Sequence, residues 1–443
     1  MIGRDRCEAV LSQTLDQPNI READAYLSVQ DLSLTRFASN DIHQNVSHGN
    51  AQLHIRVVVG QRQGRATTND LSDGGIQRAA KLAHQNALLM PEDPDFNGLT
   101  IPGAPPQVAT HDLDTESYGP ASRSQVVASV CRLAEASGLE ASGFFRNGTQ
   151  ETAVLSTKGA RAYHAGTFAG LLVMAISDTS AGWSKGGSWR IEDIDSDALA
   201  DEAVDKALRG QNPRTVEPGE YTVVLDPYAV DDMLSSLSLY GMGAQSVQEE
   251  RSWMNGLIGE RAMSPQISIW DDGADLEGWP VPFDAEGVPR QRTQLVREGV
   301  VLDPVHNSYT AGKEGKRSTG HQFAFTGPPV ASNLFMQTGD SSLEKMIAST
   351  QRGLYITRFH YTRLVHNRNC VMTGMTRDGT FLIKDGQLSY PVKDLRFTQS
   401  YVEALAGVEA VGSQSKLVLN EVGFATKVPA LKIGRFNFTG VTV

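Results

Sequence analysis

The chain has 443 residues, of which 40% are hydrophobic and 21% are charged. A domain takes roughly 100–200 residues, so the length predicts two or three domains with sizeable cores. The formal net charge of -11 argues against binding to a nucleic-acid backbone, which requires a clustered Lys/Arg surface.

Local patterns predict mixed helix and strand structure in the first half of the chain. Small and apolar residues recur at helical spacing at Ala79, Leu82, Ala83 and Ala87, and β-branched residues crowd Gln52–Val59. In chain order, the predicted elements are a helix at Asp5–Thr14, strands at Ala25–Leu34, Gln52–Val59 and Arg65–Thr68, a helix at Gly75–Met90, a surface loop at Leu99–Pro120, a helix at Ala121–Ser137, strands at Thr152–Ser156, Ala160–Ala165 and Ala169–Ile176, and a helix at Ser196–Leu208.

The second half is predicted to be richer in strands. Arg209–Gly219 contains two prolines and is the best candidate for a domain boundary. It is followed by a buried-strand pattern at Tyr221–Leu225 and by a helix whose apolar face includes Leu234. Glycine turns then separate short strands, and one helix at Ser341–Gln351 carries a capping box formed by Ser341 and Glu344. We therefore expect an α+β protein, with a mixed N-terminal domain at 1–212 and a β-rich C-terminal domain with few helices at 218–443.

The cysteines and the first residues bear on the cellular compartment. The three cysteines, Cys7, Cys131 and Cys370, are odd in number and far apart, so no disulfide framework is predicted. Met1 to Gln17 lacks the apolar core of a secretory signal, and no apolar run is long enough to span a membrane. We therefore expect a cytoplasmic protein with no membrane partner.

Two short patterns suggest chemistry but have plainer interpretations. Gly182-Trp183-Ser184-Lys185-Gly186 matches the G-x-S-x-G pattern of hydrolase nucleophiles, yet no helix is predicted after it, which favours a chance match in a loop. His360, His366 and Cys370 could supply imidazole and thiolate to zinc if the segment were one extended strand. A turn at Asn367–Asn369 would break that alternation, so ordinary polar positions are the favoured interpretation.

Ordered motifs in the second half resemble the TldD/PmbA family. The chain carries, in the family's order, Pro218–Pro227, Ile267–Asp272, Pro282–Pro289, Gln291–Thr293, Glu298–Val300, Asn307–Ala311, Ser318–His321, Gly339–Asp340, Arg377–Ile383, Asp385–Gly386, Pro391–Val392 and Arg396–Phe397. No single motif is specific, but their shared order over some 220 residues is. The first half is similar to the family more weakly, chiefly at Val57–Ala66.

The resemblance implies a zinc site that this chain lacks. Catalytic members of the family carry H-E-x-x-x-H on the first helix of this domain, together with a distant C-terminal cysteine. Here the two histidine positions hold Ser235 and Tyr240, the glutamate position holds Ser236, and Val411–Thr439 contains no cysteine. Neutral hydroxyls are poor zinc ligands, and no carboxylate is left as a base.

The resemblance therefore implies a TldE (PmbA)-like subunit with no catalytic residues and no bound cofactor of its own. Its expected partner is a TldD-like, zinc-bearing catalytic subunit, in a heteromeric peptidase that acts on unfolded or small peptides and possesses no nucleic-acid partner. Two alternatives stay open: a stand-alone metallopeptidase using His360, His366 and Cys370, and a binding or regulatory protein of the gyrase-modulator type.

Two family-like segments are the candidate substrate- or partner-binding residues. They are Ser318, Thr319, Gly320 and His321 in one predicted loop, and Arg377 with Asp378 in a predicted turn. An arginine can give paired hydrogen bonds to a carboxylate or to backbone carbonyls. The alternative is that Arg377 and Asp378 only pair with each other. His321 has no carboxylate or nucleophile near it in sequence, which argues against a catalytic base there.

Overall fold

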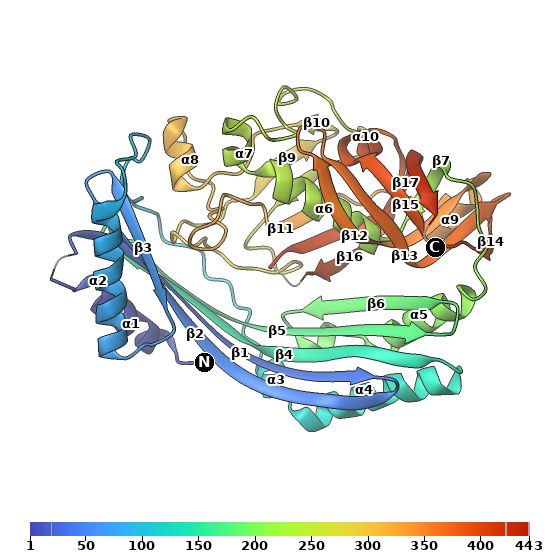
Figure 1. The fold of residues 1–443 in the computed structure, drawn as a ribbon, viewed down its shortest axis with the longest axis horizontal. Helices are drawn as coiled ribbons and strands as arrows, with labels where there is room; N and C mark the ends of the chain where they lie inside the picture. The colour runs from blue at the N-terminus through green and yellow to red at the C-terminus, as the bar shows by residue number, and fades with distance from the viewer. Residues whose placement is uncertain (19, 421–422, 442–443) are drawn as a thin grey trace.

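The protein consists of two sheets stacked with a layer of helices (Figure 1). The computed structural model describes residues 1–18, 20–420 and 423–441. The N-terminal sheet lies in the middle, helices cover one of its faces, and the C-terminal domain covers the other. The predicted α+β class is confirmed.

The N-terminal sheet has six antiparallel strands in the order β3-β2-β1-β4-β5-β6. Its strands are β1 (Glu22–Ala38), β2 (Asp41–Val59), β3 (Arg62–Thr68), β4 (Glu140–Ser156), β5 (Arg161–Ile176) and β6 (Ala181–Ser188). Its helices are α1 (Arg4–Leu15), α2 (Asp73–Leu89), α3 (Leu113–Ser117), α4 (Pro120–Ala136), α5 (Ser196–Arg209) and the short η1 (Ile191–Asp193).

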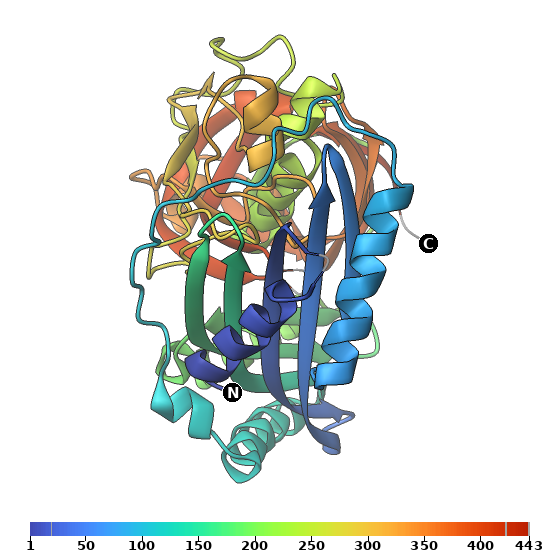
Figure 2. The same cartoon turned by 90° about the vertical axis from the view of Figure 1, so that its left-hand side faces the viewer.

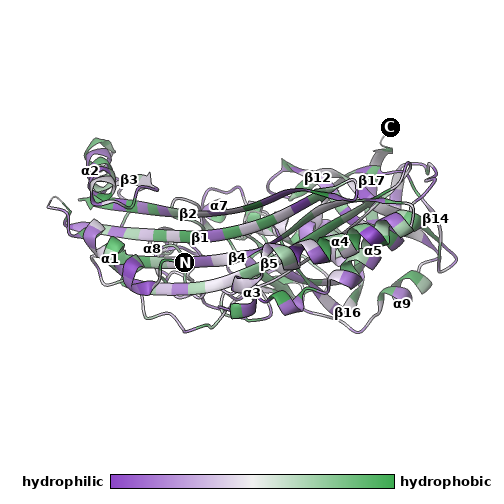
Figure 3. Ribbon diagram, turned by 90° about the horizontal axis from the view of Figure 1, so that it is seen from below, coloured by the Kyte–Doolittle hydropathy of each residue, from purple (hydrophilic) through white to green (hydrophobic). Residues whose placement is uncertain are grey.

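Alternation along β1 separates the two faces of this sheet. Ala23, Ala25 and Leu27 pack against α1 and α2, while Asp24 and Tyr26 between them face the C-terminal domain. A second apolar cluster joins the other end of the sheet to α4 and α5, and Figure 3 shows these helices lying across the strands.

The C-terminal domain is built on an eleven-stranded mixed sheet, in which β7 pairs in parallel with β12 and β11 pairs in parallel with β17. Its strands are β7 (Gly219–Leu225), β8 (Ile269–Asp271), β9 (Thr293–Arg297), β10 (Val300–Val301), β11 (Asn333–Met336), β12 (Arg352–His366), β13 (Val371–Lys384), β14 (Gln387–Pro391), β15 (Leu395–Ser400), β16 (Val408–Leu419) and β17 (Ala425–Val441). Its helices are α6 (Pro227–Leu237), the π-helical η2 (Ser238–Met242), α7 (Ala244–Gln248), α8 (Ser308–Lys313), α9 (Leu343–Ala348) and α10 (Tyr401–Ala406).

The helix α6 is central to the largest apolar core of the chain. Val230, Met233, Leu234 and Leu237 lie on one face of α6 and are fully buried against that core. Asp226 caps the helix by accepting a hydrogen bond from the backbone N–H of Tyr228. The predicted apolar face of this helix is therefore confirmed.

Several predicted local elements differ from the structure. The helix predicted at Ser341–Gln351 is only α9, Leu343–Ala348, and Ser342 caps it in place of Ser341. Gly182–Gly186 belongs to β6 rather than to a loop. The turn predicted at Arg377–Gly379 lies inside β13, where a register shift places Asp378 at φ 54° and Gly379 at φ 132°.

Three further differences come from long-range pairing. The strands predicted at Ala160–Ala165 and Ala169–Ile176 form the single strand β5, because β4 pairs with it along its whole length. The predicted loop at Leu99–Pro120 contains the short helix α3. Leu82, expected on the apolar face of α2, is exposed, whereas Ala79 and Ala83 are buried.

The sheets change between α5, which ends at Arg209, and β7, which begins at Gly219. The predicted domain boundary lies in this interval. No helix within residues 1–18, 20–420 and 423–441 combines the length and apolar character needed to cross a membrane.

Candidate functional site

Two hydroxyl side chains occupy the positions where the resemblance implies zinc ligands. Ser235 is half-buried near the end of α6, and its hydroxyl donates to Asp231 at 3.1 Å. Tyr240 lies in η2, half-buried, and packs against the main core of the C-terminal domain. Zinc prefers an imidazole nitrogen or a thiolate sulfur, and neither side chain provides one.

Two carboxylates on α6 accept hydrogen bonds from hydroxyl side chains. Thr426 on β17 donates to Asp231 at 2.7 Å, and Tyr401 donates to Asp232 at 2.7 Å. Burial raises the pKa of Asp231 to about 6 and also raises the pKa of Asp232.

These residues do not fit a zinc ion. Ser235 contributes a hydroxyl, and the carboxylate of Asp231 to which it donates is also engaged by Thr426. In the described part of the chain, no three His, Cys, Asp or Glu side chains are grouped so that they could hold a metal ion. The set is therefore unsuited to the Lewis-acid chemistry of a zinc peptidase.

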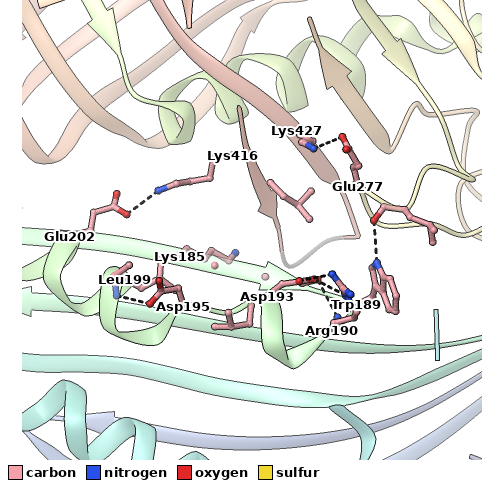
Figure 4. Close-up of a pocket in the computed structure, with 17 residues that line it drawn as sticks. Lys185, Trp189, Arg190, Asp193, Asp195, Leu199, Glu202, Glu277, Lys416 and Lys427 are labelled. Atoms are coloured by element: carbon pink, nitrogen blue, oxygen red, sulfur yellow. Dashed lines mark hydrogen bonds and ion pairs between the residues drawn. The ribbon is translucent and has the colours of Figure 1, made fainter. Parts of the chain in front are cut away.

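Beside the N-terminal end of α6 lies a cleft of about 730 Å³ between the two domains (Figure 4). One wall comes from β6, η1 and α5, and the other comes from β16, β17 and the loop near Glu277. The lining residues are Lys185, Gly186, Gly187, Ser188, Trp189, Arg190, Asp193, Ile194, Asp195, Ala198, Leu199, Glu202, Leu276, Glu277, Lys416, Leu417 and Lys427.

Charged side chains link the two walls of the cleft. Lys416 on β16 bonds Glu202 on α5 at 2.9 Å, and the indole N–H of Trp189 donates to the carbonyl of Leu276 at 3.1 Å. Burial opposes ionisation of Glu202, but Lys206 and Lys416 outweigh it and lower its pKa. The cleft therefore offers fixed charges of both signs beside apolar surface.

Tyr228 connects α6 to this cleft. Its hydroxyl donates to the backbone carbonyl of Lys185 at 3.0 Å and accepts from the backbone N–H of the same residue at 3.0 Å. The Lys416 ammonium donates to the same hydroxyl at 3.0 Å. Burial and the neighbouring Glu202 carboxylate raise the pKa of Tyr228, so the hydroxyl stays protonated and able to donate.

The predicted pair Arg377 and Asp378 lines a second interdomain pocket of about 320 Å³. Asp378 is buried and bonds Arg358 at 2.6 Å, whereas Arg377 is half-exposed with its Nε 3.6 Å from the same carboxylate. Burial raises the pKa of Asp394 in this pocket to about 6, although Arg377 opposes the shift. The guanidinium of Arg377 is therefore more accessible than that of Arg358.

The Ser318–His321 segment lies in different surroundings, and its four residues line neither of these two interdomain pockets. His321 is fully buried, with Nε2 2.9 Å from Asp271 of β8 and Nδ1 2.9 Å from the Thr319 hydroxyl. Burial opposes ionisation of Asp271, but His321 lowers its pKa. Gly320 is also buried, whereas Ser318 and Thr319 are half-buried, and a binding role for the four residues stays a prediction.

The structure does not bring the other candidate residues together into a metal site or a nucleophile site. His360 and His366 are exposed on β12, whereas Cys370 is buried beyond the turn, where burial raises the pKa of its thiol to about 12. Within residues 1–18, 20–420 and 423–441, these three side chains do not form a group that could hold a metal ion. Ser184 is buried and donates to the carbonyl of Leu199 at 2.6 Å, which is a packing role rather than that of a nucleophile.

Sequence reasoning missed the cleft and the partner of His321. Lys185, Glu202 and Lys416 come from three elements, and Asp271 precedes His321 by 50 residues. No spacing rule connects such residues, so only the family-like order of ISIWDD and STGH offered a signal.

Comparison with known proteins places the chain in a family. The PmbA/TldA metallopeptidase domain 1 profile matches residues 23–87, the central-domain profile matches 114–211, and the C-terminal-domain profile matches 218–440, half of the chain. The chain belongs to the TldD/PmbA family. The first two profiles both fall in the six-stranded sheet, so together they form one structural layer.

Relatives in the TldD/PmbA family are distant in sequence. A metalloprotease of Methanothermobacter thermautotrophicus is 25% identical over 62% of this chain and 62% of its own length. The metalloprotease TldD homolog of Haemophilus influenzae is 27% identical over 58% of this chain and 56% of its own. The chain thus matches about three-fifths of the length of these relatives.

Solved structures share the fold. TldE from Thermococcus kodakarensis superposes with a TM-score of 0.87 over 98% of this chain and 100% of that one, at 18% identity. A Thermotoga maritima protein described as a modulator of DNA gyrase superposes with a TM-score of 0.84 over 94% of this chain and 96% of that one, at 20% identity. At this identity the likeness concerns the fold alone.

Proposed function

We propose that this chain is the non-catalytic partner subunit of a TldD/TldE-type heteromeric zinc metallopeptidase. The observation that carries the proposal is the donor set of α6 and η2, where Ser235 and Tyr240 occupy the ligand positions while the fold around them is intact. A hydroxyl pair of this kind is unsuited to zinc, so the zinc and the water-activating base belong to a TldD-like partner.

The substrate class proposed for the complex is unfolded or small peptides, including precursors of peptide natural products. The cleft beside α6 supports this, because Lys416, Glu202 and Trp189 combine charges of both signs with apolar surface. A peptide carries the same combination of backbone dipoles, charged ends and apolar side chains. The expected location of the complex is the cytoplasm.

The proposal is tested by reconstitution with the TldD-like homologue from the same genome. Alone, the chain should bind substoichiometric zinc and cleave an unstructured casein-like substrate no faster than background. The homologue should bind one zinc and gain peptidase activity when the chain is added. One tightly held zinc on the isolated chain, lost in Cys370→Ala, or full activity of the homologue alone, contradicts the proposal.

The cleft is tested in the same complex. Lys416→Ala removes the ammonium that bridges the walls and should raise the KM for peptide several-fold, with a smaller effect on kcat. Lys384→Ala, an exposed lysine at the end of β13, is the matched control and should leave both constants unchanged. Equal constants in the two variants would remove the cleft from the proposal.

A second candidate function is regulation of DNA gyrase, because two proteins of the same fold are described as modulators of that enzyme. The net charge of -11 favours a protein contact over a DNA contact in that case. A supercoiling assay with purified gyrase and increasing amounts of the chain separates this function from peptide processing.

A further inference from the structure

A further pocket opens on the inner face of the N-terminal sheet, which Figures 1 and 2 show lying under the C-terminal domain. Its volume is about 240 Å³. Sites that enclose a whole small molecule measure roughly 300–1,000 Å³, so this pocket suits a single large side chain better than a cofactor. Its apolar walls are Leu32 and Phe168 from the sheet and Trp279, Leu419 and Phe424 from the C-terminal domain.

The register of β1, β4 and β5 sets the sheet side of this pocket. Leu32, Gly148 and Phe168 lie in one row across the three strands. A Cβ at Gly148 would lie 2.7 Å from Cζ of Phe168, so the glycine allows the ring to lie over β4. The ring of Phe168 also packs near that of Trp279, with centroids 6.3 Å apart. The two rings are therefore neighbouring walls that are in place before any ligand binds.

Trp279 belongs to a loop that is bonded to both domains. Its backbone N–H donates to Oδ1 of Asn333 on β11 at 2.8 Å. Three residues earlier, the carbonyl of Leu276 accepts from the indole N–H of Trp189 at 3.1 Å. A wall held in this way loses little freedom when a ligand packs against it, which favours binding.

Two side-chain amides stand beside the apolar walls. Gln30 of β1 lies opposite Gln150 of β4, and both line the pocket. Within the described ranges 1–18, 20–420 and 423–441, neither side-chain amide makes a hydrogen bond. Amides donate and accept, as peptide backbone groups do. Of the described lining residues only Arg146 is charged, and its guanidinium lies over the ring of Phe144. The pocket therefore favours an uncharged occupant.

The pocket adjoins the interdomain cleft. Ser188, which lines the cleft, pairs across β5 and β6 with Ala169, which lines the pocket. A narrow space of about 20 Å³ shares Trp189 with the cleft and shares Gln150 and Trp279 with the pocket. A peptide lying in the cleft therefore has the mouth of the pocket within reach of its neighbouring side chains.

We propose that this pocket is a specificity subsite, which receives one uncharged aromatic side chain of a peptide held in the cleft. The ring packs against Phe168 and Trp279, and the amides of Gln30 and Gln150 bond the peptide backbone beside it. The inference rests on the proposed function, since it takes a peptide as the ligand. It goes further by naming the kind of residue that the peptide carries.

Calorimetric titration of the full chain with three capped peptides tests the subsite. The peptides consist of alanine and serine and differ only at the central residue, which is phenylalanine, leucine or alanine. The phenylalanine peptide should bind at least about tenfold more tightly than the alanine peptide, because it buries a large apolar side chain. It should bind about two- to tenfold more tightly than the leucine peptide, because of the contacts between rings.

Three results of this titration overturn the proposal. They are equal affinities for the phenylalanine and alanine peptides, binding of the leucine peptide as tight as that of the phenylalanine peptide, and no binding of any of the three.

Variants assign the preference to this pocket. Trp279→Ala removes a wall, and Leu32→Trp fills the space. Each should bring the dissociation constants of the phenylalanine and alanine peptides to within about threefold of each other. Trp279→Phe retains a ring and should retain the preference. Leu388→Trp is the matched control, because it changes a half-buried leucine of β14 that lines neither the pocket nor the cleft.

Thermal unfolding shows which variants keep the fold. If Leu32→Trp does not fold, the comparison of Trp279→Ala with Trp279→Phe decides the question. A full preference for phenylalanine in Trp279→Ala, or its loss in Leu388→Trp, overturns the assignment.

The subsite and the partner-subunit proposal fail separately. Binding to the isolated chain requires no peptidase activity. An active reconstituted complex whose chain has no preference for phenylalanine overturns the subsite alone. An inactive complex whose chain prefers the phenylalanine peptide supports the subsite and contradicts the partner-subunit proposal.

Discussion

Asp378 is contacted by two arginines, and the two contacts are unequal. Arg358 is mostly buried, bonds the carboxylate at 2.6 Å and stacks over the ring of Trp183 from the N-terminal domain. Arg377, its neighbour across the β12–β13 pairing, is half-exposed and lies at 3.6 Å. The buried carboxylate therefore depends on Arg358, and Arg377 is available for another molecule.

Arg377→Ala should change stability by less than about 1 kcal/mol, because exposed ion pairs contribute little. Arg358→Ala should cost about 2–4 kcal/mol, because it leaves a buried carboxylate poorly paired. Urea unfolding of both variants measures the difference. In the reconstituted complex Arg377→Ala should weaken activity; a large loss of stability with full activity would instead make Arg377 a structural residue.

The raised pKa of Asp231 predicts a pH-dependent stability. Burial raises this pKa from 3.8 to about 6, so the folded state holds the proton more tightly than the unfolded state. The wild type should therefore lose stability as the pH rises from about 4 to about 6, and the loss should level off above that range.

Asp231→Asn keeps the carbonyl oxygen that accepts from Ser235 and Thr426 but cannot ionise. The variant should match the wild type near pH 4 and exceed its stability at pH 8 by at most about 3 kcal/mol. Unfolding free energies at the two pH values provide the measurement. A difference between the proteins that does not grow with pH contradicts the assignment.

At the scale of elements, α2 lies close to the sheet because small side chains line the contact between them. Gly64 of β3 and the alanines of α2 allow backbone-to-backbone packing, and α5 packs in the same way on β6, where a Cβ at Gly182 would overlap the backbone of Ala203. Both glycines therefore have a steric role. The G-x-S-x-G pattern on β6 arises from this packing and not from a nucleophile.

Gly64→Ala should destabilise the N-terminal layer by about 1–3 kcal/mol or more, because rigid backbone must move to admit the methyl group. Gly103→Ala, in a loop where a Cβ would touch nothing within 4 Å, is the control and should stay within about 0.5 kcal/mol of the wild type. Thermal unfolding of the two variants checks this, and equal stabilities would refute the close-packing account.

At the scale of the whole molecule, a buried ion cluster joins the two domains. Arg56 on β2 bonds both oxygens of Asp24 on β1, at 2.8 and 2.6 Å, and bonds Glu286 of the C-terminal domain at 3.2 Å. The second Glu286 oxygen accepts from the backbone N–H of Ser308 at 2.9 Å. The family-like segment Pro282–Pro289 thus fixes the orientation of the domains that form the cleft.

Arg56→Met should cost about 3–5 kcal/mol, because two buried carboxylates lose their shared cation. Arg56→Lys should recover only part of this loss, since an ammonium cannot reproduce the paired geometry. Arg161→Met removes an exposed pair with Glu8 and should change little. Calorimetry of the three variants tests the cluster, and equal melting temperatures would show that it does not hold the domains together.

The sequence by itself determined the local elements and the family. Helical periodicity located α1, α2, α4, α5 and α6, because backbone hydrogen bonding and side-chain periodicity within a helix are local. The order of short motifs predicted the family, and the family profiles confirm it. The serine and tyrosine at positions 235 and 240 could likewise be read directly from the aligned motif.

Only the tertiary structure decided which of these residues meet. Lys185, Glu202 and Lys416 form one cleft, and Asp271 pairs with His321, through sheet pairings and domain packing that no short pattern records. Burial of Leu82 was mispredicted for the same reason: the identity of an inner helix face depends on how closely the sheet approaches it. The spacing of apolar residues along the chain predicts which face of a helix is buried. The opposing surface decides how large the side chains on that face can be.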